Sequence, residues 1–137
     1  MNSVTTSPPT STPSLWTARV LTTLVIVFML FDATIHIMKP APVVDAFTRL
    51  GYPLSASVGI GILELFCLIA YAIPRTAPLG AVLLTGVLGG AVSTHVRAGS
   101  PAFEAYIFPV MLGAMIWGGI WLRDSRLRAI FPVRTRD

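Results

Sequence analysis

The sequence has little charge and almost no cysteine. Only 12% of its 137 residues are Asp, Glu, Lys or Arg, whereas 54% are hydrophobic. Because soluble domains contain about 25% charged residues, this composition excludes an ordinary soluble globular protein. The single cysteine, Cys67, excludes an intramolecular disulfide and dithiol exchange within the chain.

Motifs of soluble enzymes and of nucleic-acid-binding proteins are also missing. The sequence has no Gly-rich phosphate loop, no Ser-His-Asp signature and no interleaving of aromatic and basic residues. The net charge of +4 owes most to arginines directly after the last apolar block, namely Arg123, Arg126, Arg128, Arg134 and Arg136. This placement favours an anionic lipid surface as the partner and not nucleic acid.

Four apolar blocks account for most of the chain. The expected spans are residues 15–38, 54–73, 77–96 and 102–122. At about 1.5 Å per residue, helices of this length cross roughly 30 Å of hydrocarbon. Short Pro-containing connections make successive helices antiparallel. The predicted fold class is therefore all-α, an integral membrane four-helix up-and-down bundle.

Segments outside the spans have their own composition. Residues 1–14 are rich in Ser, Thr and Pro and are expected to form a disordered tail, and residues 123–137 form a basic tail. Residues 43–50 suit a short amphipathic turn at the surface, and Pro109 should kink the fourth span. Both termini are expected in the cytoplasm, because their side holds seven Lys or Arg residues and the other side three, Lys39, Arg49 and Arg97.

Small residues in the third and fourth spans predict close helix contacts. Gly86 and Gly90 form a GxxxG pattern, and the fourth span contains Gly113, Gly118 and Gly119. In lipid, small residues let helix backbones approach and gain dispersion energy. The sequence leaves open whether these faces pack within the bundle or against a second copy in a homo-oligomer.

Glu64 is the most informative polar residue, because it lies near the middle of the second span. An ionised carboxylate at mid-bilayer costs at least about 2.5 kcal/mol, so Glu64 needs a partner, a cation or a proton. Thr85, near the middle of the third span, is a plausible neighbour because a short turn joins the two helices. The site is interpreted either as a proton or ligand site or as a protonated Glu that holds helices together.

Asp32 and His36 are spaced i, i+4 near the outer end of the first span, so they share one helix face. An Asp can hold one imidazole nitrogen and raise the basicity of the other, which suits a proton relay or a metal ligand. The alternative is a solvated histidine at a helix end. The sequence alone assigns no metal site.

Other polar residues gather at the same expected depth. His95 and Arg97 close the third span, Glu104 opens the fourth, and Tyr106 follows it. We expect these residues either to join Asp32 and His36 in one outer polar pocket or, for Arg97 and Glu104, to form an ion pair across the turn. A haem held by His36 and His95 is disfavoured, because the first and third helices of such a bundle are usually diagonal.

Several short segments resemble the DoxX-like family of small bacterial membrane proteins. They are Gly61–Leu65, Tyr71–Thr76, Leu79–Ala81, Leu84–Gly86, Gly89–Ala91, Thr94–Arg97, Phe108–Pro109 and Trp117–Gly118. The resemblance covers roughly residues 16–124 and implies a four-helix up-and-down bundle in the bacterial inner membrane. The wider DoxX/DoxD group includes subunits of quinone-linked sulfur-compound oxidoreductases and partners of redox enzymes. It identifies no catalytic residue in this chain.

The favoured hypothesis is a membrane component of a quinone-linked or other redox system. The cofactor stays open, with quinone as one candidate, and a redox protein is one candidate partner besides the lipid bilayer. The alternatives are a non-catalytic membrane subunit or scaffold, and a small carrier of protons or another solute. Four spans without an inverted repeat form a thin transport pathway unless the chain oligomerises. Whether the protein is an enzyme stays open at this point.

Overall fold

The computed structural model describes residues 12–130, which form helices and their connections without any strand. Its elements are α1 (Thr12–Met38), α2 (Ala41–Leu50), α3 (Ser55–Ala72), α4 (Ala77–Arg97), the π-helix η1 (Phe103–Ile107), α5 (Phe108–Arg123) and α6 (Ser125–Ile130). Residues 1–11 and 131–137 lie outside the described part, and with them most of the expected N-terminal tail and the end of the basic C-terminal tail.

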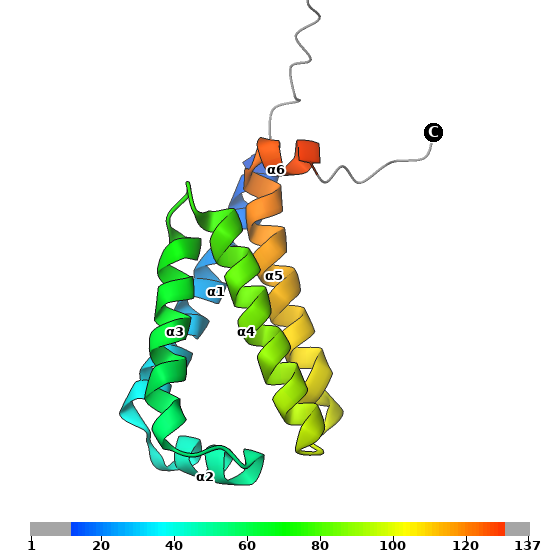
Figure 1. The fold of residues 1–137 in the computed structure, drawn as a ribbon. Coiled ribbons are helices and arrows are strands. Elements are labelled where there is room, and N and C mark those ends of the chain that lie inside the picture. Colours follow the sequence, from blue (N-terminus) through cyan, green and yellow to red (C-terminus); the bar gives the residue numbers. More distant parts are fainter. Residues whose placement is uncertain (1–11, 131–137) are drawn as a thin grey trace, which may run out of the picture.

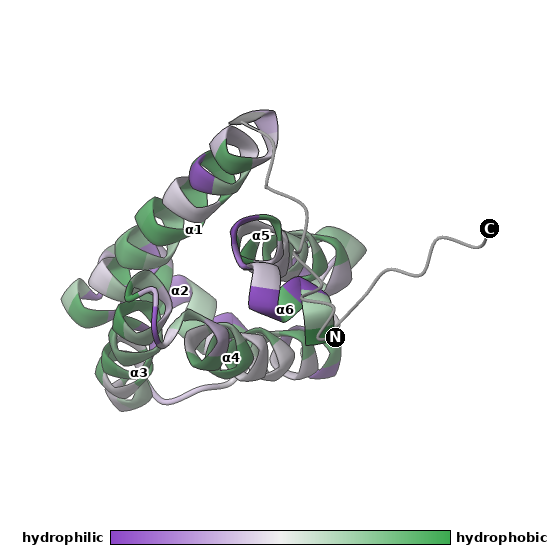
Figure 2. Cartoon of the chain, turned by 90° about the horizontal axis from the view of Figure 1, so that it is seen from above, coloured by the Kyte–Doolittle hydropathy of each residue, from purple (hydrophilic) through white to green (hydrophobic). Residues whose placement is uncertain are grey.

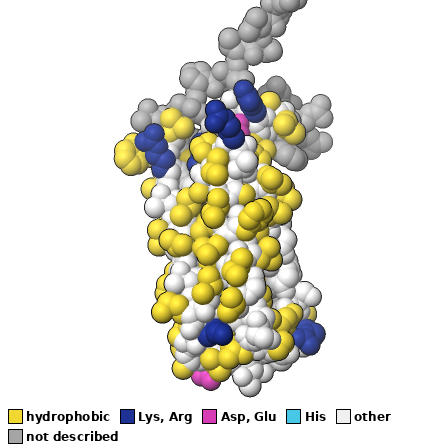
Figure 3. Space-filling view, turned by 60° about the vertical axis from the view of Figure 1, so that its left-hand side comes forward, with side chains coloured by type: hydrophobic (Ala, Val, Ile, Leu, Met, Phe, Trp, Pro, Cys, Tyr) yellow, Lys and Arg dark blue, Asp and Glu magenta, His cyan; other side chains and the backbone are white. Residues whose placement is uncertain are grey.

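The four expected spans are confirmed as helices that are long and apolar enough to cross a membrane. They are Pro13–Met38, Ser55–Ala72, Ala77–Arg97 and Phe103–Arg123. Large hydrophobic side chains remain exposed along all four, among them Val27, Phe66, Val82 and Val110. On the face in Figure 3, hydrophobic side chains cover the middle of the molecule, and Lys and Arg lie near its two ends. The protein is an integral, multi-pass membrane protein.

The four long helices form an up-and-down bundle (Figure 1). Helix α1 packs against α3 and α5, and α4 packs against the same two helices, so that α1 and α4 are diagonal (Figure 2). The end of the bundle where α1 begins and α5 finishes is called the terminal end. The opposite end, where α2 lies across the bundle, is called the α2 end.

Close helix packing depends on three glycines. A Cβ atom on Gly61 would lie 2.7 Å from Ala33 O, and one on Gly119 would lie 2.8 Å from Thr22 Oγ1. A Cβ on Gly80 would overlap the backbone of Tyr71. By contrast, Gly86 and Gly90 have no atom within 4 Å of an added Cβ. The GxxxG pattern of the third span therefore makes no contact within the described chain and faces outward.

The core lies on the terminal side of mid-bundle and is mainly apolar. Tyr71, Leu84, Ile116 and Val25 are fully buried there. The Tyr71 hydroxyl donates a hydrogen bond of 3.0 Å to Ile116 O, which ties α3 to the diagonal helix α5. A buried hydroxyl needs such a partner, so this bond fixes how the two helices face each other.

The expected amphipathic turn is a full helix, α2, of ten residues. Val43 and Phe47 lie one turn apart and are both buried, so the helix rests its apolar face on the α2 end. Pro42 in its first turn suits a helix start, because the ring fixes φ and the missing N–H has no acceptor there. Gly51 closes it in the left-handed conformation, with φ of 73°.

The fourth span changes helix type before Pro109. The π-helix η1 precedes α5, and the Phe108 N–H bonds Phe103 O, five residues earlier. In a regular α-helix the ring of Pro109 would clash with the carbonyl of Ala105, and its nitrogen donates no hydrogen bond. The wider turn absorbs this conflict and keeps the span continuous to Arg123.

Candidate functional site

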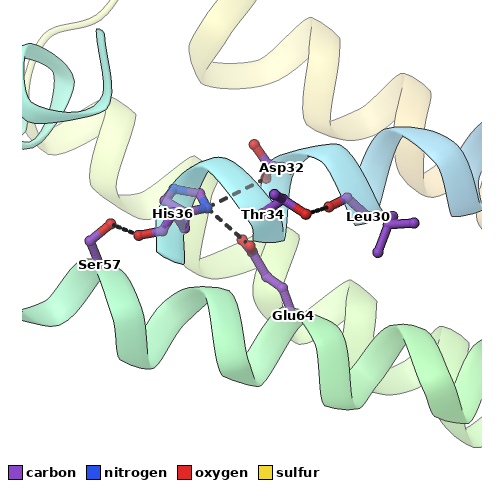
Figure 4. Close-up of polar contacts among 6 residues, drawn as sticks. All are labelled: Leu30, Asp32, Thr34, His36, Ser57 and Glu64. Carbon is purple, nitrogen blue, oxygen red and sulfur yellow. Dashed lines mark hydrogen bonds and ion pairs between the residues drawn. The ribbon is translucent and has the colours of Figure 1, made fainter. Parts of the chain in front are cut away.

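The central polar contact joins α1 to α3. His36 Nδ1 lies 3.0 Å from Glu64 Oε2. Helical side chains lean toward the N-terminus of their own helix, and α1 and α3 are antiparallel neighbours. His36 therefore leans into the bilayer from near the end of α1, and Glu64 leans toward the α2 end, so that the two side chains meet between the helices (Figure 4).

Two small residues of α3 make this meeting possible. Gly61 leaves room for α1, because an added Cβ would lie 3.0 Å from His36 Cβ and closer still to Ala33 O. The Ser57 hydroxyl donates a hydrogen bond of 2.6 Å to the carbonyl oxygen of His36. Ser57, Gly61 and Glu64 thus lie on one buried face of α3 and fix the position of the histidine backbone.

Asp32 completes a group of three ionisable side chains. Its Oδ2 lies 4.0 Å from His36 Nδ1, one turn earlier on α1. One ligand atom from each of Asp32, His36 and Glu64 can be chosen so that all lie within 4.8 Å of one another. The exposed fraction of the side chain falls from 30% for Asp32 to 18% for His36 and 4% for Glu64. We call these residues the α1–α3 triad.

Burial of the α1–α3 triad limits its charge. Two carboxylates beside a neutral imidazole carry two negative charges, which a membrane-spanning segment does not accommodate without compensation. Two protons, or one doubly charged cation, make the group neutral. The arrangement can therefore hold and pass protons, accept a hydrogen bond from a ligand, or bind a metal ion.

Thr85 does not join this group, although the sequence made it a plausible partner of Glu64. Its hydroxyl donates to Ala81 O at 2.7 Å and accepts a bond of 2.9 Å from Trp117 Nε1. Thr85 therefore links α4 to α5. The short turn after α3 does pair α3 with α4, but the face of α3 that carries Glu64 turns toward α1.

A second polar group lies at the α2 end. Arg49 donates a hydrogen bond of 3.4 Å to Glu104 Oε2. His95 Nδ1 lies 3.7 Å from the same oxygen and 2.9 Å from Ser100 Oγ. We call Arg49, His95, Ser100 and Glu104 the α2-end cluster. Its contacts join α2, α4 and η1, and none of them involves the α1–α3 triad.

The ion pair at this end involves a different arginine from the expected one. Glu104 bonds Arg49, whereas the sequence had predicted a pair of Glu104 with Arg97. Arg97 instead donates to Leu50 O at 3.0 Å and lies over the Tyr52 ring, 5.6 Å from its centroid. The reason is α2, which crosses the end of the bundle and brings Arg49 up to η1. The single outer pocket expected from the sequence is therefore two separate groups, and Tyr106 remains exposed.

Comparison with known proteins identifies the family. The model of the DoxX-like family matches residues 20–119 of this chain. The chain belongs to the DoxX-like family. The matched region contains the whole α1–α3 triad and the α2-end cluster. No curated protein and no solved structure matches the chain.

Sequence reasoning missed the residues that position the triad. Ser57, Gly61 and Glu64 recur at i, i+4 and i+7, which places two small residues and the acid on one helix face. This pattern was the available signal for a close helix contact at Glu64. Arg49 was missed as the partner of Glu104, since nothing in its local sequence indicates that α2 crosses the bundle.

Proposed function

We propose that the protein is a membrane component of a quinone-linked or other redox system, in which the His36–Glu64 pair exchanges a proton with the bound carrier. One observation carries this proposal: a carboxyl group with a 4% exposed side chain lies inside a membrane span and contacts an imidazole nitrogen at 3.0 Å. Ionisable groups at this depth are costly and mark proton or ligand pathways.

The chemistry needs a proton donor within the apolar bundle. Reduction of a quinone to a quinol takes up two electrons and two protons, one on each oxygen. Of these two protons, protonated His36 would supply one to a quinone oxygen, and Glu64 would stabilise the imidazolium before transfer. The other quinone oxygen would take its proton from water. Asp32 lies one turn earlier on α1, 4.0 Å from His36 Nδ1, and would exchange a proton with the pair. The electrons come from a redox partner protein.

Two features support a quinone as the carrier. The triad lies among apolar side chains, with the Phe47 ring edge-on to His36 at 5.8 Å between centroids, which suits a lipophilic ring. The chain is also similar to a group whose wider membership includes subunits of quinone-linked oxidoreductases. A proton carrier is the second candidate, favoured by the stepwise burial from Asp32 to Glu64.

The proposal includes an orientation in the bacterial inner membrane. The terminal end of the bundle carries Arg19, Arg75, Arg123 and Arg126, whereas Lys39, Arg49 and Arg97 lie toward the α2 end. The bias toward positive charge on the cytoplasmic side then puts the termini in the cytoplasm and the triad on the periplasmic side of mid-bilayer. Reporter fusions after residue 137 and within residues 98–102 test this orientation.

The deciding experiment combines purification with genetics. We expect a lipid extract of the purified protein to contain about one quinone per chain, and the Glu64→Gln variant to lose complementation of a deletion strain while still folding. The matched control is Glu104→Gln, which alters the exposed glutamate and should complement fully. Purified protein without quinone and a deletion strain with normal quinone reduction would contradict the redox function. Proton flux in proteoliposomes that Glu64→Gln abolishes would then establish the carrier instead.

A further inference from the structure

We infer that the α1–α3 triad is a binding site for a divalent first-row transition-metal ion. Its three donors come from two helices: an imidazole nitrogen of His36 and carboxylate oxygens of Asp32 and Glu64. One imidazole with two carboxylates is a ligand set suited to Zn²⁺, Mn²⁺ or Fe²⁺. This inference rests on the three donors and not on the redox function. An ion bound to His36 Nδ1 and Glu64 would replace the proton that this pair exchanges, so the metal-bound and proton-exchanging forms are alternative states of one triad.

The spacing of the donors suits one ion. Metal–ligand distances of about 2.0–2.2 Å put two ligands of the same ion at most about 4.4 Å apart. His36 Nδ1 lies 3.0 Å from Glu64 Oε2 and 4.0 Å from Asp32 Oδ2, and all three donors fit within 4.8 Å. A small rotation of the Asp32 side chain therefore completes the set. Three protein ligands leave further coordination positions open for water or a substrate.

The charge of the triad also favours a divalent metal ion. Asp32 and Glu64 as carboxylates, with neutral His36, carry two negative charges, and a divalent ion cancels both. No Lys or Arg in the described chain forms an ion pair or hydrogen bond with these three side chains that would compensate the two charges. Within a membrane span the neutral, metal-bound form avoids most of the cost of buried charge.

The protein holds two of the ligands in place before an ion arrives. Ser57 bonds the His36 carbonyl at 2.6 Å, and Gly61 allows α1 and α3 to approach, so His36 and Glu64 face each other without rearrangement. Pre-positioned ligands lower the entropic cost of binding. The second histidine, His95, lies in no comparable group of three ligands within the described residues.

The test is titration of the full chain in detergent with Co²⁺, a spectroscopic substitute for Zn²⁺, after purification without a histidine tag. We expect d–d absorption that saturates at one Co²⁺ per chain and disappears when Zn²⁺ is added. His36→Ala should weaken Co²⁺ binding by more than about 100-fold, because loss of an outer-shell partner alone costs 10–100-fold. The matched control His95→Ala removes the other histidine and should bind as the wild type does.

Asp32→Asn keeps the test decisive if His36→Ala fails to fold, because Asp32 is the most exposed ligand and its loss should also weaken Co²⁺ binding. A folded wild-type chain without d–d absorption would overturn the site, as would absorption that all variants retain. The redox function is tested separately by the quinone content of the lipid extract. Protein that contains quinone but binds no Co²⁺ therefore contradicts the metal site alone.

Discussion

The two histidines of this chain occupy opposite settings although each has a glutamate within 4.0 Å. His36 meets Glu64 inside the bundle, where the glutamate side chain is 4% exposed. His95 meets Glu104 at the α2 end, where the glutamate side chain is 37% exposed and Arg49 competes for the same oxygen. Residue type alone therefore does not identify a site. Glu64 lies inside a membrane span, and within residues 12–130 no Lys or Arg contacts the His36–Glu64 pair, so its charge is costly there and points to function.

The largest expected difference between the two pairs is in activity. Glu64→Gln should lower quinone-linked activity in complemented membranes by about 100-fold, the usual loss when a general acid–base group is removed. Glu104→Gln should change it less than about twofold, because its carboxylate lies outside the triad. The rate of quinone reduction in membranes with matched protein levels measures both. Equal losses of activity in the two variants would show that the buried His36–Glu64 pair is no more important for activity than the exposed His95–Glu104 pair.

The next prediction concerns helix packing beside the triad. Gly61→Ala should lower the free energy of unfolding by about 1–3 kcal/mol, because the added Cβ would lie 2.7 Å from a backbone oxygen. Gly86→Ala should be neutral or stabilise by up to about 1 kcal/mol, since open space surrounds that glycine and Ala favours helix. Unfolding in mixed micelles gives both values. A destabilising Gly86→Ala would instead reveal a contact with a second copy of the chain.

A smaller effect is expected from the bond that holds the His36 backbone. Ser57→Ala should destabilise the protein by about 0.6 kcal/mol, the average for hydrogen bonds between membrane helices. Ser55→Ala, at the exposed start of the same helix, is the control. The same unfolding assay applies. If Ser57→Ala lowers stability no more than the control does, the Ser57 hydroxyl does not secure the α1–α3 contact.

The smallest effect should come from the α2-end cluster. Arg49 and Glu104 are 59% and 37% exposed at their side chains, and such pairs contribute about 0.2–1 kcal/mol. A double-mutant cycle with Arg49→Ala and Glu104→Ala should give a coupling energy in that range that shrinks as salt is added. A coupling energy above about 2 kcal/mol, or one insensitive to salt, would show that the Arg49–Glu104 pair is shielded from water as strongly as the α1–α3 triad is.

The fold could be predicted from the sequence because lipid imposes simple rules. Apolar length places the four spans, and prolines separate them, so that the expected spans differ from the helices by at most a few residues. The one major addition is α2, whose ten residues include Pro42 and read as a loop by hydropathy. Its amphipathic pattern, with Val43 and Phe47 one turn apart, predicted a surface turn but not its path across the bundle.

The pairing of Asp32 with His36 could be predicted from the sequence, but the partner of Glu64 could not. Spacing within one helix sets which residues share a face, so Asp32 and His36 could be paired from the sequence. Which neighbouring helix meets Glu64 depends on the rotation of α3, and that rotation follows from the fit of Gly61 against α1. Chain order predicts that α3 has both α1 and α4 as neighbours, but it does not say which of them the Glu64 face meets, and the short turn to α4 indicated Thr85.

The most direct test of the account is whether His36 and Glu64 work as one unit. Quinone-linked activity should be measured for His36→Asn, Glu64→Gln and the double variant, each at wild-type protein levels. Two residues that share one proton give non-additive losses of activity. The double variant should therefore be as active as the less active of the two single variants. A double variant whose loss equals the product of the two single losses, or two single variants with wild-type activity, would contradict the account.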